Sequence, residues 1–135
     1  MQDFSKYIGI PYVKGRRDIS TPSKGLDCWG MVCYFYKNEY NVILPPYENI
    51  DTSKEKVSEC SDKLIITDCY STFKTTTHSK LGDLLLFRIG QHPIHIGIAL
   101  DNKHMLHAHD KTGSVIERFD GIKWKNRLVS IHRII

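Results

Sequence analysis

The sequence predicts an α+β fold in which a helical first half packs against an antiparallel sheet of about five strands. Three observations support this prediction. The chain has 135 residues, a length typical of one domain, so we expect a single domain over residues 1–135. Before residue 80, apolar side chains recur at helical spacing. After it, short β-prone runs follow one another with only a few turn residues between them.

The first half divides into short elements around one main helix. In chain order, we expect a short opening helix at 3–7, an extended segment at 10–13, a polar loop at 15–25, the main helix at 27–39 and a polar surface helix at 51–62. Pro45 and Pro46, which cannot continue a helix, close the segment that follows the main helix. Residues 65–80 fit neither a helical nor a strand pattern and stay unassigned.

The main helix has a clear start signal. Asp27 is a good N-cap because its carboxylate can accept hydrogen bonds from the unpaired N–H groups of the first turn. Apolar and aromatic residues then fall on one face of the helix, at Val32, Phe35, Tyr36 and Tyr40. We therefore expect this face to be buried.

Five β-prone runs make up the second half. They cover residues 83–88, 94–100, 105–109, 114–119 and 127–132. Turn residues separate them, at Gly90, Asp101-Asn102, Thr112-Gly113 and Asp120-Gly121. Strands so close in sequence must pair through hairpins, so the sheet should be antiparallel.

Composition and charge exclude several classes of function. Lys and Arg total 19 against 15 Asp and Glu, a net charge of +4, but the basic residues are scattered rather than gathered on one stripe as in a nucleic-acid-binding protein. No apolar run approaches the ~20 residues of a membrane span. The N-terminus lacks the layout of a secretory signal, so we expect synthesis in a bacterial cytoplasm and no disulfide framework among the four cysteines.

Cys28 is the sharpest candidate for a catalytic group. It directly follows the predicted N-cap, where unpaired N–H groups and the positive end of the helix dipole lower the pKa of a thiol and favour the nucleophilic thiolate. The other interpretation is a small buried cysteine in an amphipathic helix, and position alone leaves both open. Cys33 lies away from the helix start and is expected in the core.

A nucleophilic cysteine needs a base, and His95 and His107 are the candidates. His95 stands among apolar residues of the 94–100 run, so it is either a hydrogen-bonded core residue or a catalytic base. His107 lies on the return strand of the same hairpin. A three-residue loop centred near Asn102 would place both on one face, where one imidazole can orient the other, whereas a two-residue turn would separate them. A catalytic pair therefore depends on that loop.

The remaining candidates each have a plain structural alternative. Tyr12 precedes the loop into the main helix, where its hydroxyl would donate to a developing oxyanion beside the Cys28 N–H; otherwise it is a packed aromatic residue. Trp29 either lines a substrate groove or caps the core, and Asp27 is a candidate contact for a cationic substrate group. The cysteines and histidines lack the spacing of a structural zinc site, so we expect no metal.

Taken in order, these motifs resemble the NlpC-type cell-wall cysteine peptidases, a family of small papain-like hydrolases. The resemblance spans most of the chain and rests on these segments: Gly9-Ile10-Pro11-Tyr12, Asp27-Cys28-Trp29-Gly30, Gly82-Asp83-Leu84, His95-Ile96-Gly97-Ile98 and His107-Ala108. Each segment is weak alone, but the helix start, the strand start and the histidine strand in this order are jointly specific.

The resemblance implies a Cys-His-His triad, with Cys28 as the nucleophile, His95 as the base and His107 as the residue that orients the base. It also implies that Tyr12 contributes to the oxyanion site. Enzymes of this family cleave peptide bonds in the stem peptides of peptidoglycan, often between D-glutamate and a diamino acid, and they need no cofactor.

One departure from the family pattern points to a particular branch. The family commonly has Ser after the nucleophile, whereas this chain has Trp29, a form that looks like the branch found in bacteriophage and prophage tails. We therefore expect a tail-associated peptidoglycan hydrolase that the virion delivers to the cell wall, in contact with other tail proteins. The alternative is a structural tail-assembly module of the same fold. Trp29 is consistent with it, and so is the loop after Tyr12, where Lys14-Gly15-Arg16-Arg17 replaces the usual Gly-Gly of the family.

Overall fold

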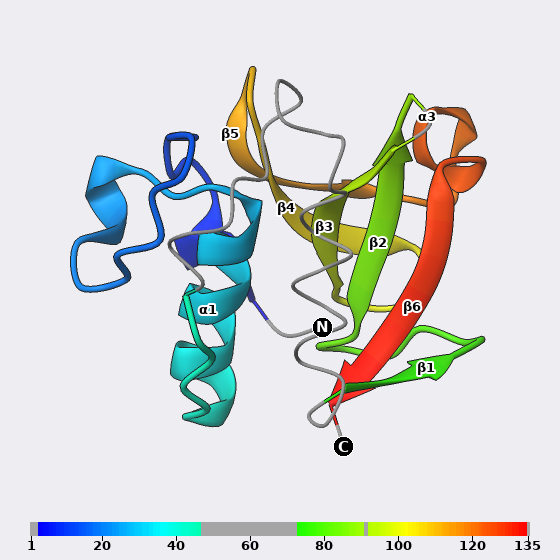
Figure 1. Ribbon diagram of the computed structural model, residues 1–135, viewed down its shortest axis with the longest axis horizontal. Helices are drawn as coiled ribbons and strands as arrows, with labels where there is room; N and C mark the ends of the chain where they lie inside the picture. Colours follow the sequence, from blue (N-terminus) through cyan, green and yellow to red (C-terminus); the bar gives the residue numbers. More distant parts are fainter. Residues whose placement is uncertain (1–2, 47–72, 91, 135) are drawn as a thin grey trace.

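The structure of the protein is a computed structural model that describes residues 3–46, 73–90 and 92–134. Within these ranges a long helix, α1 (Cys28–Tyr40), stands beside a six-stranded sheet (Figure 1). Short helical segments are η1 (Ser5–Tyr7), η2 (Pro22–Lys24) and α3 (Ile122–Lys125). The helix predicted at 51–62 lies outside the described residues. The predicted α+β class is confirmed.

The sheet is antiparallel at every described pairing. Its strands are β1 (Phe73–Thr76), β2 (Leu84–Ile89), β3 (His92–Ala99), β4 (His104–His109), β5 (Gly113–Arg118) and β6 (Leu128–Ile134). They are ordered β1-β6-β2-β3-β4-β5, so the last strand lies between the first two. Five of them correspond to the predicted runs. The sixth, β1, falls in the region that the sequence left unassigned, because it is a short edge strand rich in polar residues.

Helix α1 begins at the predicted N-cap and ends where Asn41 adopts a left-handed conformation, with φ of 53°. Phe35 and Tyr36 are buried as expected, and the Tyr36 hydroxyl donates to the Gly82 carbonyl. The prediction was wrong for Tyr40, which is 41% exposed because it lies on the last turn of the helix, with its ring against Gly82 and one side open to solvent.

The core consists of two apolar clusters on opposite faces of the sheet. Helix α1 packs on β3 and β4, and the first cluster joins the helix to Leu84, Leu86, Ile96, Ile98, Leu106 and Ala108. The second cluster consists of Leu85, Phe87, Ala99, Met105, Phe119 and Trp124. Alternation along β2, β3 and β4 sends successive side chains to the two clusters in turn. Trp124, on the one-turn helix α3, closes the second cluster.

Candidate active site

Cys28 is the first residue of α1, as predicted, and it is buried. The preceding Asp27 caps the helix, because its Oδ1 accepts a hydrogen bond from the Gly30 N–H at 2.8 Å. Its Oδ2 accepts from Arg17 Nε, also at 2.8 Å, in an ion pair whose two side chains are fully buried. The guanidinium compensates the charge of the capping carboxylate, so the start of α1 is fixed without an isolated buried anion beside Cys28.

Arg16 and Arg17 lie directly against the start of the helix. The Asp27 N–H donates to the Arg16 carbonyl at 2.9 Å, and the Arg16 guanidinium donates to the Gly25 carbonyl at 2.6 Å. A Cβ on Gly30 would come within 2.8 Å of the Arg16 carbonyl, so only glycine allows this close approach. The arginine pair therefore braces the loop that carries the cysteine.

The extended segment 10–13 ties the start of α1 to one end of the sheet. On one side, the Leu26 N–H donates to the Pro11 carbonyl at 2.9 Å. On the other side, the Ser114 N–H donates to the Ile10 carbonyl at 2.8 Å, and Ser114 Oγ accepts from the Ile10 N–H at 2.7 Å. Segment 10–13 thus joins the loop just before Cys28 to the end of the sheet where β5 begins.

The two candidate histidines meet at this end of the sheet. The β3–β4 register pairs Ile98 with Leu106 and Ala99 with Met105, which centres the loop on Asn102. The Leu100 N–H donates to the His104 carbonyl at 2.9 Å and closes a loop of three residues. The loop on which a histidine pair depended is therefore confirmed. His95 Nε2 lies 2.7 Å from His107 Nδ1, and we call these two side chains the imidazole pair.

Aromatic rings surround the imidazole pair and keep it from water. Trp124 stacks on His95 with ring centroids 5.4 Å apart and meets His107 edge-on at 5.2 Å. Burial, reinforced by the neighbouring His107 and His109, lowers the pKa of His95 well below its usual range. Burial, with smaller contributions from His109 and Lys123, lowers the pKa of His107 to about 3. Both rings are therefore neutral near pH 7, and each carries one N–H.

Two further residues complete this cluster, and the sequence analysis did not identify them. Glu117 Oε1 lies 2.6 Å from His107 Nε2, and Trp124 Nε1 donates to the same oxygen at 3.0 Å. Strand parity could have found Glu117, because β5 pairs Val115 with His107 and places Glu117 two residues further on the same face. Trp124 gave no such signal, since it lies on a helix of four residues.

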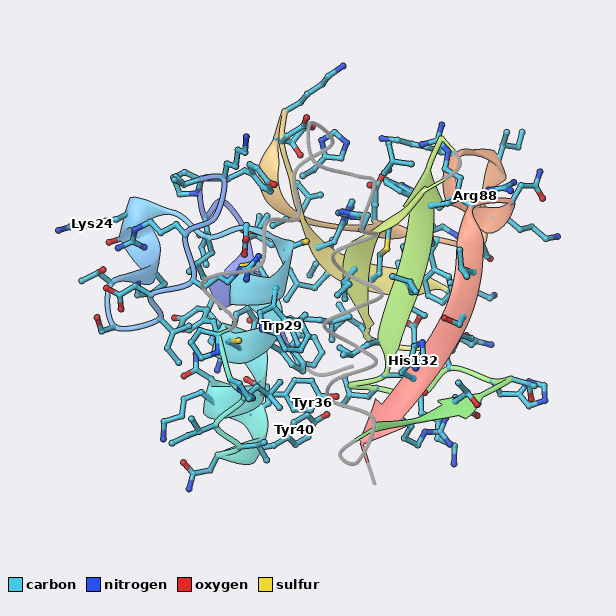
Figure 2. The ribbon with its side chains drawn as sticks, viewed as in Figure 1. Lys24, Trp29, Tyr36, Tyr40, Arg88 and His132 are labelled. Carbon is cyan, nitrogen blue, oxygen red and sulfur yellow. The ribbon has the colours of Figure 1, made fainter. Side chains whose placement is uncertain are left out.

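The other predicted site residues divide into two groups. Trp29, labelled in Figure 2, is fully buried, and its indole N–H donates to the Pro45 carbonyl at 2.8 Å. Asp27 is fully buried as well, so we assign both to packing and helix capping in place of the substrate contacts first considered. Tyr12 is half-buried and forms a parallel bridge with Leu26, close to the start of α1. Its role at the oxyanion stays a prediction.

Neither Cys28 nor Cys33 forms a disulfide within the described ranges. Within the described ranges, no three His, Cys, Asp or Glu side chains come together in an arrangement that would hold a metal ion. None of the helices in that part of the chain is long and apolar enough to cross a membrane.

A cysteine at a helix start and an imidazole pair on neighbouring strands of an antiparallel sheet define a papain-like domain. The sequence model of the NlpC/P60 family matches residues 9–133, and the chain belongs to this family. The family resemblance seen in the motifs is therefore confirmed.

Three similar proteins illustrate the relationship. The chain is 25% identical over 137 residues to the murein DD-endopeptidase/LD-carboxypeptidase MepS of Escherichia coli. This alignment covers 100% of the chain and 61% of the relative. Over 45 residues, 33% of this chain and 10% of the relative, it is 47% identical to the gamma-DL-glutamyl hydrolase of Bacillus subtilis. A lipoprotein-like NLP/P60 protein of Staphylococcus aureus has the same fold, with a TM-score of 0.65 and 24% identity over 97% of this chain and 38% of the other. The chain thus spans less than two thirds of each of these proteins.

Proposed function

We propose that this protein is a cysteine peptidase that hydrolyses amide bonds in the stem peptides of bacterial peptidoglycan. The observation that carries the proposal is the position of Cys28 on a capped helix start, which segment 10–13 joins to the sheet end that holds the imidazole pair. Membership of the NlpC/P60 family and similarity to a murein endopeptidase support the substrate class.

Acylation begins when His95 Nδ1 takes the proton of the Cys28 thiol. The thiolate attacks the carbonyl carbon of the scissile amide, a C–S bond forms, and the carbonyl π electrons move to oxygen. The Cys28 N–H, at the positive end of α1, and the Tyr12 hydroxyl donate to the resulting oxyanion. The electrons then return, the C–N bond breaks, and the leaving amine takes the proton from the His95 imidazolium.

Deacylation repeats the same proton transfers with water. His95 removes a proton from water as the water oxygen attacks the acyl carbon of the thioester. The C–S bond breaks, the carboxylic acid product leaves, and the proton on His95 returns to the Cys28 sulfur. A neutral buried imidazole suits this role, because it can accept a proton in each half of the cycle.

We further infer that the bond cleaved joins D-glutamate to the diamino acid of the stem peptide. The local similarity to a gamma-DL-glutamyl hydrolase supports this assignment. The similarity to MepS favours a different bond, the DD-cross-link named for that enzyme. Hydrolysis of the two bonds gives products of different mass, so one experiment separates them.

The test is mass spectrometry of peptidoglycan fragments after incubation with the wild-type protein, Cys28→Ala and Cys33→Ala. Cys33→Ala is a matched control, because both cysteines lie in α1 and each is 3% exposed. We expect stem fragments ending in D-glutamate with the wild type and the control, and none with Cys28→Ala. Products of cross-link cleavage alone would overturn the assignment of the bond, and equal cleavage by Cys28→Ala would overturn the mechanism.

Alkylation with iodoacetamide, followed by peptide mapping, provides an independent readout. Since Cys28 and Cys33 are equally buried, faster labelling of Cys28 near neutral pH reports thiolate character rather than access. Equal labelling of the two, together with unchanged peptidoglycan, would support a structural tail-assembly module instead of a hydrolase.

We also propose that the protein acts from the tail of a bacteriophage or prophage particle, where it contacts other tail proteins and opens the wall locally. The support comes from the residue after the nucleophile: Trp29 fills a buried site that the Ser common in the family would leave empty. Immunoblotting of purified particles should detect the protein, whereas its absence from particles and presence in the cell envelope would contradict this location.

A further inference from the structure

The hydrogen-bonded chain behind His95 extends one residue beyond the imidazole pair. His95 Nε2 and His107 Nδ1 are 2.7 Å apart, and His107 Nε2 and Glu117 Oε1 are 2.6 Å apart. The indole N–H of Trp124 donates to the same Glu117 oxygen at 3.0 Å. The His107 side chain is fully buried, whereas that of Glu117 is 31% exposed, so a solvated carboxylate ends a buried chain.

The positions of the protons along this chain follow from the acceptor at its end. An ionised carboxylate can only accept hydrogen bonds, so the proton of the neutral His107 ring must be on Nε2. His107 Nδ1 is then an acceptor, and His95 Nε2 must carry the proton that it accepts. The remaining nitrogen of His95, Nδ1, is left with a lone pair.

We propose that Glu117 is a positioning residue that sets the tautomer of His95 through His107, and that Trp124 holds Glu117 in place. The catalytic part of this inference rests on the proposed function, because there the Nδ1 lone pair of His95 receives the Cys28 proton. Glu117 takes up no proton itself. Through the intervening His107 ring, it determines which nitrogen of His95 is unprotonated and can accept a proton.

The reverse arrangement would disable the base. If His107 carried its proton on Nδ1, it would donate to His95 Nε2, and the proton of the neutral His95 ring would move to Nδ1. A base protonated at Nδ1 cannot accept a proton there. The carboxylate also favours the imidazolium that forms on His95 during turnover, as the acid of a catalytic triad does.

Other acids at the ends of β4 and β5 have partners of their own. Asp110 lies 3.3 Å from His109 Nδ1, Asp101 lies 3.0 Å from His104 Nδ1, and Asp120 forms an ion pair with Arg118 at 2.7 Å. Asp120 lies three residues after Glu117 and has the same charge. It therefore offers a matched control for removing a carboxylate without touching the chain behind His95.

The first experiment observes the tautomers directly and needs no substrate. Long-range ¹H–¹⁵N correlation spectra of protein labelled at histidine distinguish protonated from unprotonated ring nitrogens. We expect both rings of the imidazole pair to be protonated at Nε2 in the wild type and in Asp120→Asn. In Glu117→Gln, whose amide can also donate, and in Glu117→Ala, we expect a mixture or the reversed tautomers. Unchanged tautomers in both Glu117 variants would overturn the proposal.

The second experiment measures hydrolysis of the substrate identified above. Glu117→Ala should lower kcat roughly 10- to 100-fold with KM nearly unchanged, the size of effect expected when a histidine loses the partner that orients it. Glu117→Asp should recover part of the loss, and Asp120→Asn should match the wild type. Full activity of Glu117→Ala would refute a positioning role. If the wild type cleaves no peptidoglycan but its tautomers respond to Glu117 as expected, the proposed function fails and the assignment of Glu117 stands.

Discussion

The nucleophile side and the base side of the candidate site are built in different ways. On the nucleophile side, Arg16, Arg17, Asp27 and Gly30 surround Cys28, and all of them come from one stretch of fifteen residues, 16–30. The base side combines three strands and α3, and its members lie far apart in the chain. Local rules of helix capping determine the first, whereas strand register determines the second.

The two sides also handle charge in opposite ways. The nucleophile side buries a complete ion pair, Arg17 with Asp27, with both side chains fully inaccessible. The base side buries two neutral rings and leaves its carboxylate, Glu117, partly in solvent. A substitution in the residues that hold Cys28 in place should therefore act mainly on folding, and one on the base side mainly on catalysis and on its dependence on pH.

The largest effect should come from removing the base. His95→Ala leaves the Cys28 thiol without a proton acceptor, so kcat/KM should fall by roughly 10²- to 10⁴-fold. The measurement is the initial rate of peptidoglycan fragment release, with circular dichroism to show that the fold is retained. His104→Ala is the matched control, because that ring pairs with Asp101 beside the hairpin loop and outside the cluster. Equal rates for the two variants would remove His95 from the mechanism.

Breaking the buried ion pair should have the next largest effect, and on stability. Arg17→Met leaves the Asp27 carboxylate buried without its cation, which should lower the free energy of unfolding by about 3–5 kcal/mol in urea titrations. The double variant Arg17→Met/Asp27→Asn should recover part of this loss, since the uncompensated charge is gone and the capping oxygen remains. A loss below about 1 kcal/mol would mean that water reaches the pair and that it behaves as a surface ion pair.

The same contrast explains what the sequence could reveal. The Asp27 cap and the position of Cys28 follow from local preferences, and both were predicted correctly. The loop centred on Asn102 was derived as a condition for the imidazole pair, because parity links loop length to the face that a side chain occupies.

Tertiary packing hid the remaining features. Glu117 acquires its role only through the β4–β5 register, and Trp124 reaches Glu117 from a helix of one turn. Trp29 next to a nucleophile suggested a substrate contact, but the carbonyl of Pro45, sixteen residues away, receives its indole N–H. Spacing within one sequence does not show such partners, since they depend on how distant segments meet.

Acid should destabilise the protein through the base side. In the unfolded chain a histidine titrates near 6.5, whereas burial lowers the pKa of folded His107 to about 3, so between these values the unfolded state binds more protons. Stability therefore falls as pH falls, by about 2 kcal/mol for the His107 ring between pH 7 and pH 5. His109 and Lys123 disfavour a further charge on His107 and act in the same direction.

Urea unfolding at pH 7, 6 and 5 measures this dependence. The variant His107→Gln cannot take up the proton, so its stability should fall less steeply over the same range, whatever its stability at pH 7. Carboxyl groups contribute little in this window because they titrate mostly below pH 5. Parallel curves for the two proteins would show that the pKa of His107 does not change on folding, which would contradict the lowered pKa that keeps this ring neutral.

The smallest effect compares one substitution on both sides of the site. Trp124→Phe and Trp29→Phe each remove a buried indole N–H from its acceptor, Glu117 in one case and the Pro45 carbonyl in the other. The lost hydrogen bond should cost each variant about 1 kcal/mol of stability, in addition to the loss of packing. Only Trp124→Phe frees Glu117, so only this variant should show mixed His95 tautomers and a few-fold lower kcat. If Trp29→Phe shifts the tautomers equally, the two sides are coupled through the core, and the division between a folding side and a catalytic side fails.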